Sequence, residues 1–341
     1  MIITKTPFRI SFFGGGTDYP EYFEQHGGAV LGTSIGHSSF LSVSHFYSRL
    51  FDYNLRIAYR QVECVKTLDE IQHGAFRECL RYCGFTQDVE VSHTAHLPSF
   101  SGLGSSSSFV VGLLNALFAF RGEALEPLDL ARRAIEIERE ILQEKVGCQD
   151  QTLAAVGGFN VIEFRSLDDI RVFPVSMSAD RKEVFQQHLL LLFTGIRRRA
   201  SDIAAHQINK IPQNLDALKS MRGMVDDAHS CLTSGDLDRF GALLDRSWRL
   251  KQTLDDRIAA SGIAELYETG KRAGALGGKL LGAGGGGFLL FFVPPDRRSK
   301  VRESLQELEE IPIIIDAPGS HVLHASAITP ESIPTVSAAA S

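Results

Sequence analysis

The sequence lacks the features typical of secreted, zinc-binding and membrane-spanning proteins. Its five cysteines are odd in number and none belongs to a CxxC pair, which predicts reduced thiols and no structural zinc. The first residues lack the apolar core of a signal peptide, and no apolar run approaches the length needed to cross a bilayer. We therefore expect a cytoplasmic protein with no membrane partner.

An excess of positive charge is also missing. The 35 lysines and arginines are outnumbered by 41 aspartates and glutamates, so the net charge is −6 and the pI is about 6.0. This balance argues against nucleic acid as the main partner. Small anionic substrates stay compatible with it, because a basic pocket can lie within an acidic protein.

The composition is that of a globular protein that mixes strands and helices. Of the 341 residues, 44% are hydrophobic and 22% are charged, and this length favours two domains over one. Apolar and β-branched runs predict strands, and a 3.6-residue periodicity predicts helices. The strands are expected at 2–13, 29–35, 40–43, 46–50, 89–93 and 189–194, and the helices at 67–83, from 127 to about 147, and from 200 to about 275.

A serine-rich loop at 98–108 leads into a helical apolar pattern that ends near Phe118. Unpaired backbone N–H groups and the helix dipole make such a loop a cradle for an anion, and glycine lets the backbone approach a phosphate closely. The alternative is a linker or a helix start with more capping residues than it needs. The residues that would line the cradle are Gly102, Leu103, Gly104, Ser105, Ser106 and Ser107.

Two further glycine runs adjoin predicted strands. Gly14–Gly16 ends the first strand, and Asp18 follows two residues later. This pattern favours a loop that faces a ligand over a wide surface turn in which Asp18 caps a helix. The second run, 282–287, has GxGxxG spacing but precedes a strand, whereas a dinucleotide fingerprint opens a helix. Leu280 follows Lys279 where a Walker A motif needs serine or threonine.

Two acidic residues stand in unusual surroundings. Glu138 lies in an apolar neighbourhood, and Asp150 lies between two glutamines beside small residues. A carboxylate in such a place needs a cation, a metal or a hydrogen-bond network, although a cap or a salt bridge would also explain either residue. Phosphoryl transfer requires phosphate positioning, charge neutralisation and an oriented nucleophile, and three glycine loops with these acids can provide them.

The three loops resemble the three motifs of the GHMP kinases. Phe8–Tyr19 is similar to the first motif, Pro98–Ser106 to the second and Lys279–Gly287 to the third, in the order found in the family. The resemblance implies an α+β, two-domain GHMP kinase fold, with an N-terminal domain like domain 2 of ribosomal protein S5 and a ferredoxin-like C-terminal domain. We expect these domains at 1–185 and 186–328, with a flexible tail at 329–341.

The resemblance also implies ATP and Mg²⁺ as cofactors and assigns roles to residues. Asp150 matches the catalytic aspartate, and Arg9 would lie beside it. Glu138 and Ser106 match the Mg²⁺ ligands, and the serine loop from Gly102 to Ser107 would hold the ATP phosphates. The residues matched to substrate binding are Gly15, Gly16, Thr17, Asp18 and Gly285.

Within the family, the segments around Gly14–Gly16 and 146–151 are most similar to D-glycero-D-manno-heptose 7-phosphate kinases. The resemblance implies phosphorylation of the anomeric hydroxyl to a 1,7-bisphosphate, for nucleotide-activated heptose and surface polysaccharide. An anomeric kinase of an unphosphorylated fucose- or galactose-type sugar is the alternative, and a non-catalytic sugar or nucleotide sensor is a third. Partners would be small molecules, and a homodimer stays open.

A run of three arginines, 197–199, follows the predicted strand at 189–194. A sugar phosphate carries a second dianion that calls for a guanidinium or ammonium group. Arg199 is our choice for that contact, against the alternative of a solvated basic turn.

Overall fold

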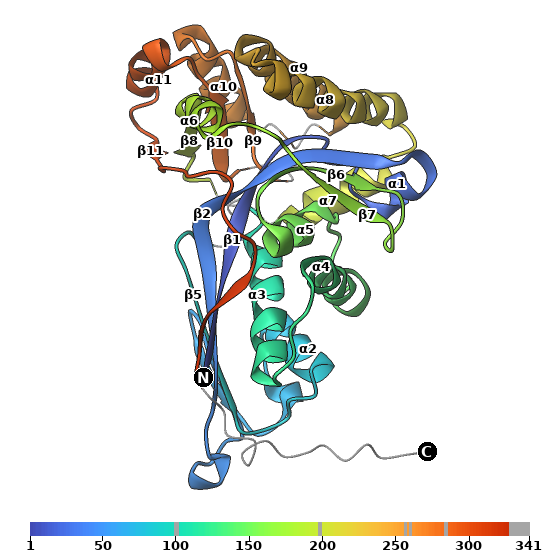
Figure 1. The fold of residues 1–341 in the computed structure, drawn as a ribbon, viewed down its shortest axis with the longest axis vertical. Coiled ribbons are helices and arrows are strands. Elements are labelled where there is room, and N and C mark those ends of the chain that lie inside the picture. The colour runs from blue at the N-terminus through green and yellow to red at the C-terminus, as the bar shows by residue number, and fades with distance from the viewer. Residues whose placement is uncertain (99–101, 197–199, 256–257, 259–260, 283–285, 327–341) are drawn as a thin grey trace.

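The structure is a computed structural model that describes residues 1–98, 102–196, 200–255, 258, 261–282 and 286–326. Within these residues, the chain forms two β-sheets with helices packed against them (Figure 1). The mixed helix and sheet content agrees with the predicted fold class. Arg199 and Gly285, like the proposed tail at 329–341, lie outside the described residues.

The first sheet has eight strands in the described chain, in the order β12-β1-β2-β5-β3-β4, with β6 paired to β2 and β7 to β6. All of these pairs are antiparallel except that of β3 with β5, which is parallel. The strands are β1 (Ile2–Phe13), β2 (Gly28–His45), β3 (Leu55–Ala58), β4 (Val62–Val65), β5 (Val89–Ala95), β6 (Phe159–Phe164), β7 (Ile170–Pro174) and β12 (His321–Ala325).

The second sheet is antiparallel, with the order β11-β8-β10-β9 among the described strands. Its strands are β8 (Leu189–Phe193), β9 (Gly277–Leu280), β10 (Phe288–Phe292) and β11 (Glu309–Glu310). The helices of the described chain are α1 (Pro20–His26), α2 (Gly74–Tyr82), α3 (Ser105–Phe120), α4 (Pro127–Glu136), α5 (Gln149–Val156), α6 (Ala179–Gln187), α7 (Ala200–Asn209), α8 (Leu215–Ser234), α9 (Leu237–Leu254), α10 (Ser261–Ala273) and α11 (Arg298–Ser304).

Strand β1 runs from the first sheet into the second half of the molecule. Its last eight residues are all buried, because α3 packs on this strand and aromatic side chains of the second half cover its end. Phe12 and Phe13 both meet the ring of Phe240 on α9 edge to face, with centroids 5.8 and 5.3 Å apart. Arg9 and the Gly14–Gly16 loop are thereby carried to the junction between the halves.

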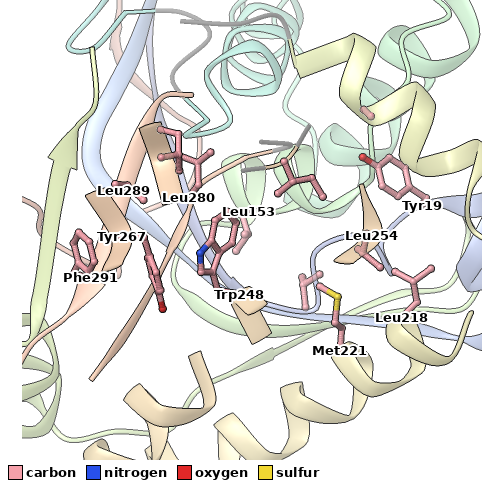
Figure 2. Close-up of a cluster of buried hydrophobic side chains, with 14 of the residues drawn as sticks. Tyr19, Leu153, Leu218, Met221, Trp248, Leu254, Tyr267, Leu280, Leu289 and Phe291 are labelled. Carbon is pink, nitrogen blue, oxygen red and sulfur yellow. The ribbon is translucent and has the colours of Figure 1, made fainter. Parts of the chain in front are cut away.

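One apolar cluster spans that junction. Tyr19 and Leu153 from the first half pack in the same cluster as Trp248, Leu280 and Phe291 from the second (Figure 2). A core shared in this way holds the loops between the halves in place, because moving one half would expose large side chains to water. The predicted boundary near residue 185 stays a prediction, but β12 returns from the end of the chain to pair with β1.

Several predicted elements differ from the structure. In the strand expected at 46–50, residues Ser48–Leu50 form a 3-10 turn, and the helix expected at 67–83 begins as α2 only at Gly74, after a 3-10 turn at Leu68–Glu70. The separate strands expected at 29–35 and 40–43 are one 18-residue strand, β2, which pairs with β1 along most of its length, with β5 at its C-terminal end and with β6 at its N-terminal end. The helix expected from residue 127 to about 147 ends as α4 at Glu136, and residues Ile137–Ile141 form a π-helical turn instead. Leu142 N donates to Ile137 O at 2.9 Å, and this bond between residues five apart in the sequence defines a π-helical turn.

Among the helices that the structure describes, none combines the length and the apolar character needed to cross a membrane.

Candidate active site

The first glycine loop is shaped by Thr17 and Asp18. Thr17 Oγ1 donates to the carbonyl oxygens of Gly14 and Ala29, at 2.8 and 2.9 Å. Gly14 has a φ of +81°, and a Cβ there would lie 1.9 Å from the Ala29 oxygen, so only glycine fits. Thr17 is fully buried, so its side chain holds the shape of this loop from inside the protein.

Asp18 joins this loop to the start of α5. Its carboxylate accepts backbone N–H groups from Gly16 at 2.9 Å and Gln149 at 3.3 Å. Burial raises the pKa of Asp18, the negative charge of Asp150 adds to that increase, and the N–H donors oppose it. Gly147 leaves the room that the carboxylate needs, since a Cβ there would lie 2.0 Å from Asp18 Oδ2.

The serine loop turns sharply before α3. Gly102 and Gly104 both have positive φ, at +82° and +71°, and the helix begins at Ser105, the first of the four consecutive serines. Gly104 lies against the Arg9 and Asp150 side chains, because a Cβ there would be 3.1 Å from Arg9 Cγ and 3.3 Å from Asp150 Oδ2. The N-terminus of this 16-residue helix therefore lies beside the side chains of Arg9 and Asp150, where a phosphate can bind its N–H groups.

Where the structure describes it, the third glycine loop approaches the serine loop backbone to backbone. A Cβ on Gly282 would lie 2.7 Å from the Gly102 Cα, and one on Gly102 would lie 2.4 Å from the Leu281 oxygen. Leu281 and Gly282, which lead into this loop, thus meet the serine loop directly. All three glycine-rich segments that the sequence singled out converge on one region.

Arg9 and Asp150 form a two-bond ion pair at the centre of this region. Arg9 Nε donates to Asp150 Oδ1 at 2.7 Å, and Nη2 donates to Oδ2 at 2.6 Å. The third guanidinium nitrogen, Nη1, donates to the Gly102 oxygen at 2.7 Å. The Arg9 side chain is 6% exposed and that of Asp150 is 25% exposed, so the carboxylate is both oriented and reachable.

Glu138 lies on the π-helical turn and points toward the start of α3. It is fully buried, and Ser107 Oγ donates to Oε2 at 2.8 Å. The side-chain amide of Gln151 also donates to Oε2. Ser106 Oγ lies 3.5 Å from Oε1, and Ser106 itself is exposed. Burial raises the pKa of Glu138 to about 8, and the charges of Glu144 and Asp150 add to this effect.

This pair of oxygen donors fits a magnesium ion that bridges phosphates. Such an ion takes one or two protein oxygens and keeps its other positions for water and phosphate. Glu138 Oε1 and the exposed Ser106 hydroxyl are two such oxygens side by side. The described residues contain no cluster of three or more histidine, cysteine or acidic ligands, so a metal held by protein alone is not indicated there.

Two buried lysines complete the region, and sequence reasoning gave neither of them a role. Lys251 on α9 donates to the Gly282 oxygen at 2.6 Å, and Lys279 on β9 donates to the oxygens of Ser11 and Phe12 at 2.7 and 2.9 Å. The sequence does contain an indication that Lys251 is buried, because it continues the apolar periodicity of Phe240, Leu244 and Trp248.

A cavity of about 460 Å³ lies elsewhere, between α2, α4 and the β6–β7 turn. Its arginines are already engaged: Arg132 pairs with Asp129 at 2.9 Å, and Arg133 donates to the Tyr82 hydroxyl at 3.0 Å. None of the predicted site residues lines it. The convergence of the three loops therefore marks the candidate active site better than cavity size does.

Comparison with known proteins agrees with this geometry. Residues 65–158 match the family model of the GHMP kinases N terminal domain, and residues 228–310 match that of the GHMP kinases C terminal domain. A D-glycero-alpha-D-manno-heptose 7-phosphate kinase from Campylobacter jejuni is 30% identical over 320 residues, covering 90% of this chain and 93% of that protein. An L-fucokinase/L-fucose-1-P guanylyltransferase from Bacteroides fragilis is 26% identical over 87% of this chain but only 35% of its own length.

Solved structures share the fold. A D-glycero-D-manno-heptose 1-phosphate kinase from Bacteroides thetaiotaomicron superposes with a TM-score of 0.78 at 24% identity, over 96% of this chain and all of that one. Lactococcus lactis galactokinase complexed with galactose gives 0.72 at 18% identity, over 94% of each chain. The chain belongs to the GHMP kinase family. It is an ATP-dependent phosphotransferase that acts on a small molecule.

Replacing Glu138 should change how the stability of the nucleotide-free protein depends on pH. Its pKa is raised from 4.5 to about 8, so the folded protein holds this proton more tightly than the unfolded chain does. The resulting stabilisation is complete below about pH 4.5 and is lost as the pH rises through 8. Thermal unfolding of the wild-type protein and of Glu138→Gln should therefore be compared between pH 5 and 9. The difference in melting temperature in favour of the wild type should become smaller as the pH rises. A difference that stays constant would contradict a raised pKa.

Proposed function

We propose that this kinase transfers the γ-phosphoryl group of ATP to the anomeric hydroxyl of D-glycero-D-manno-heptose 7-phosphate, giving the 1,7-bisphosphate. The observation that supports this substrate most is the similarity to the Campylobacter jejuni heptose 7-phosphate kinase, which extends over 93% of that protein. The product would serve nucleotide-activated heptose and surface polysaccharide synthesis.

The proposed mechanism assigns the proton transfer to Asp150. The attacking anomeric oxygen forms a bond to the γ-phosphorus as the bond from that phosphorus to the β–γ bridging oxygen breaks. ADP leaves with the bridging oxygen, and the hydroxyl proton passes to the Asp150 carboxylate. Arg9 supports this step by fixing both carboxylate oxygens, at 2.7 and 2.6 Å, so that one of them faces the nucleophile.

The other roles follow from the placement of the loops. The serine loop from Gly102 to Ser107 would hold the ATP phosphates at the start of α3, with Ser107 also binding Glu138. Mg²⁺ held by Glu138 and Ser106 would neutralise phosphate charge. The sugar would lie against the loop at Gly15 and Gly16, which the buried Thr17 and Asp18 hold in shape. Arg199 and Gly285 are also proposed to contact the substrate, and this part of the proposal is based on the sequence alone.

An unphosphorylated sugar is the second candidate substrate. The fucokinase from Bacteroides fragilis matches 87% of this chain, so the same fold and the same three loops are compatible with a plain fucose-type sugar. Galactose is less favoured, because this chain carries Gly14–Gly16 where galactokinases have Gly-Glu-His. The distinction depends on the contacts to the second phosphate.

A substrate panel tests the proposed function. ATP consumption should be measured with heptose 7-phosphate, heptose, fucose and galactose, and the product should be examined by phosphorus NMR. Heptose 7-phosphate should give the highest kcat/KM and a new signal from a phosphate on the anomeric carbon. A plain sugar used as well as or better than the 7-phosphate would overturn the substrate, and phosphorylation at another carbon would overturn the acceptor position.

Asp150→Asn should lower kcat by about 10²- to 10⁴-fold, the usual contribution of a general base. ATP affinity should change little, because the serine loop and α3 stay in place. Asp169→Asn is the matched control, since Asp169 also binds an arginine, Arg171, through two bonds, at 2.7 and 3.0 Å, but on an exposed strand end. Steady-state kinetics of both variants test the role of Asp150 as the general base. Near-normal turnover in a folded Asp150→Asn protein would rule out that role.

Glu138→Gln should raise the Mg²⁺ concentration that gives half-maximal rate, and Ser106→Ala should do so more weakly. The reason is that an amide or a lost hydroxyl leaves a poorer oxygen donor for a hard cation. Glu136→Gln serves as the control, because Glu136 lies two residues away and binds the Tyr82 hydroxyl instead. Rates measured against Mg²⁺ at saturating ATP give the comparison. Unchanged Mg²⁺ dependence in both site variants would mean that Glu138 is a structural acid.

A further inference from the structure

Lys251 occupies a position where an apolar residue is expected. The buried face of α9 carries Phe240, Leu244, Trp248 and Leu254, and Lys251 lies on that same face in the last turn of the helix. Trp248 and Leu254 belong to the cluster shown in Figure 2. Only 7% of Lys251 is exposed, so this lysine is buried, unlike lysines whose side chains extend into solvent.

The packing of α9 on β9 fixes where this ammonium group lies. A Cβ on Gly277 would be 2.0 Å from the Gly241 oxygen, so the helix and the strand touch backbone to backbone. Strand β9 then leads to Leu281 and Gly282, and Lys251 Nζ donates to the Gly282 oxygen at 2.6 Å. Gly282 in turn contacts Gly102, whose oxygen accepts a bond from Arg9. The two cations are thus held by carbonyls of two glycines in contact.

Among the residues that the structure describes, none supplies a carboxylate as a direct partner of Lys251. Within the described residues, no carboxylate lies within ion-pair distance of its nitrogen, and the Gly282 oxygen is its recorded acceptor. A buried ammonium group with three donors and one carbonyl acceptor is costly. The charges of Arg9, Asp18 and Asp150 all act on the pKa of Lys251, so this lysine shares the electrostatic environment of the candidate site. Burial lowers its pKa to about 8, so it stays protonated at neutral pH.

Two other lysines show what a purely structural arrangement looks like. Lys279 is bound by two carbonyl oxygens, those of Ser11 and Phe12, and so ties β9 to β1. Lys271 on α10 donates to the Leu276 oxygen at 2.6 Å and also lies 3.6 Å from the Asp245 carboxylate. Lys251 has the same kind of carbonyl bond as Lys271 but not the carboxylate.

We propose that Lys251 is a further catalytic residue of this kinase, and that its ammonium group binds the non-bridging oxygens of the γ-phosphoryl group during transfer. The missing anion is then supplied by the substrate. The residue gives up no proton in this step; it stabilises the charge that the γ-phosphoryl oxygens carry as the bond to ADP breaks. The proposal rests on the active site proposed above, with Asp150 as its centre.

Kinetics provide the first test. Lys251→Met keeps the length of the side chain without the charge, and kcat should fall about 10²- to 10³-fold, as on loss of one preorganised donor to a transition state. KM for the sugar substrate should change little. Lys271→Met is the matched control, because it removes a carbonyl bond of the same 2.6 Å length on α10, and kcat should stay near that of the wild type. A rise in sugar KM at unchanged kcat would overturn the proposal.

Nucleotide binding provides a test that needs neither a sugar nor turnover. Titration calorimetry in Mg²⁺ buffer should compare ADP with the β,γ-imido analogue of ATP, which carries the γ-phosphate. Lys251→Met should bind ADP as the wild type does but lose about 10- to 150-fold of its affinity for the analogue, the value of one charge-assisted bond. An equal loss for both nucleotides would mark Lys251 as structural, and no loss for either would remove it from the phosphate site.

The two proposals can fail separately. If the wild-type protein phosphorylates none of the sugars in the panel, the proposed substrate is wrong, yet the calorimetric comparison still reports on Lys251. If heptose 7-phosphate is a good substrate and Lys251→Met binds both nucleotides normally with unchanged kcat, only the role of Lys251 is wrong.

Discussion

The arrangement of the site depends on the ion pair between Arg9 and Asp150. Arg9 reaches Asp150 with two bonds and Gly102 with a third, while its backbone N–H donates to the Leu103 oxygen at 3.0 Å. One side chain on β1 therefore fixes both the carboxylate at the start of α5 and the turn that precedes α3. Because the pair is largely buried, removing either partner leaves the other without its counter-charge, a larger loss than at the surface.

The three carboxyl groups of the site differ in their surroundings, which suits them to the different roles proposed for them. Asp150 is partly exposed and bound by a guanidinium, so it is available to a substrate hydroxyl. Asp18 is bound by backbone N–H groups and joins two loops. Glu138 is enclosed on a π-helical turn with a pKa of about 8, so a cation must displace its proton before the carboxylate can bind it. Burial and hydrogen-bond partners, more than residue type, separate these functions.

Sequence reasoning identified the family, the fold class and the three glycine loops, because close backbone approach requires glycine at fixed spacings. Gly102 against Gly282 is such a contact. It missed the π-helical turn at Ile137–Ile141, since apolar periodicity does not register one inserted residue. It also missed Lys251, whose surroundings arise where α9 meets β9 and the serine loop, segments far apart in the chain. The roles proposed for the site residues stay predictions.

The pairing of β12 with β1 gives the first half of the molecule a discontinuous sequence. Residues 1–185 alone would leave the Ile2–Lys5 end of β1 without this partner, and an uncovered strand edge invites pairing with another molecule. The same pairing brings the two ends of the described chain together, where Ser326 N donates to the Met1 oxygen at 3.0 Å (Figure 1). A fold whose ends meet at one sheet edge is suited to circular permutation, with new termini opened in a surface turn away from the active site.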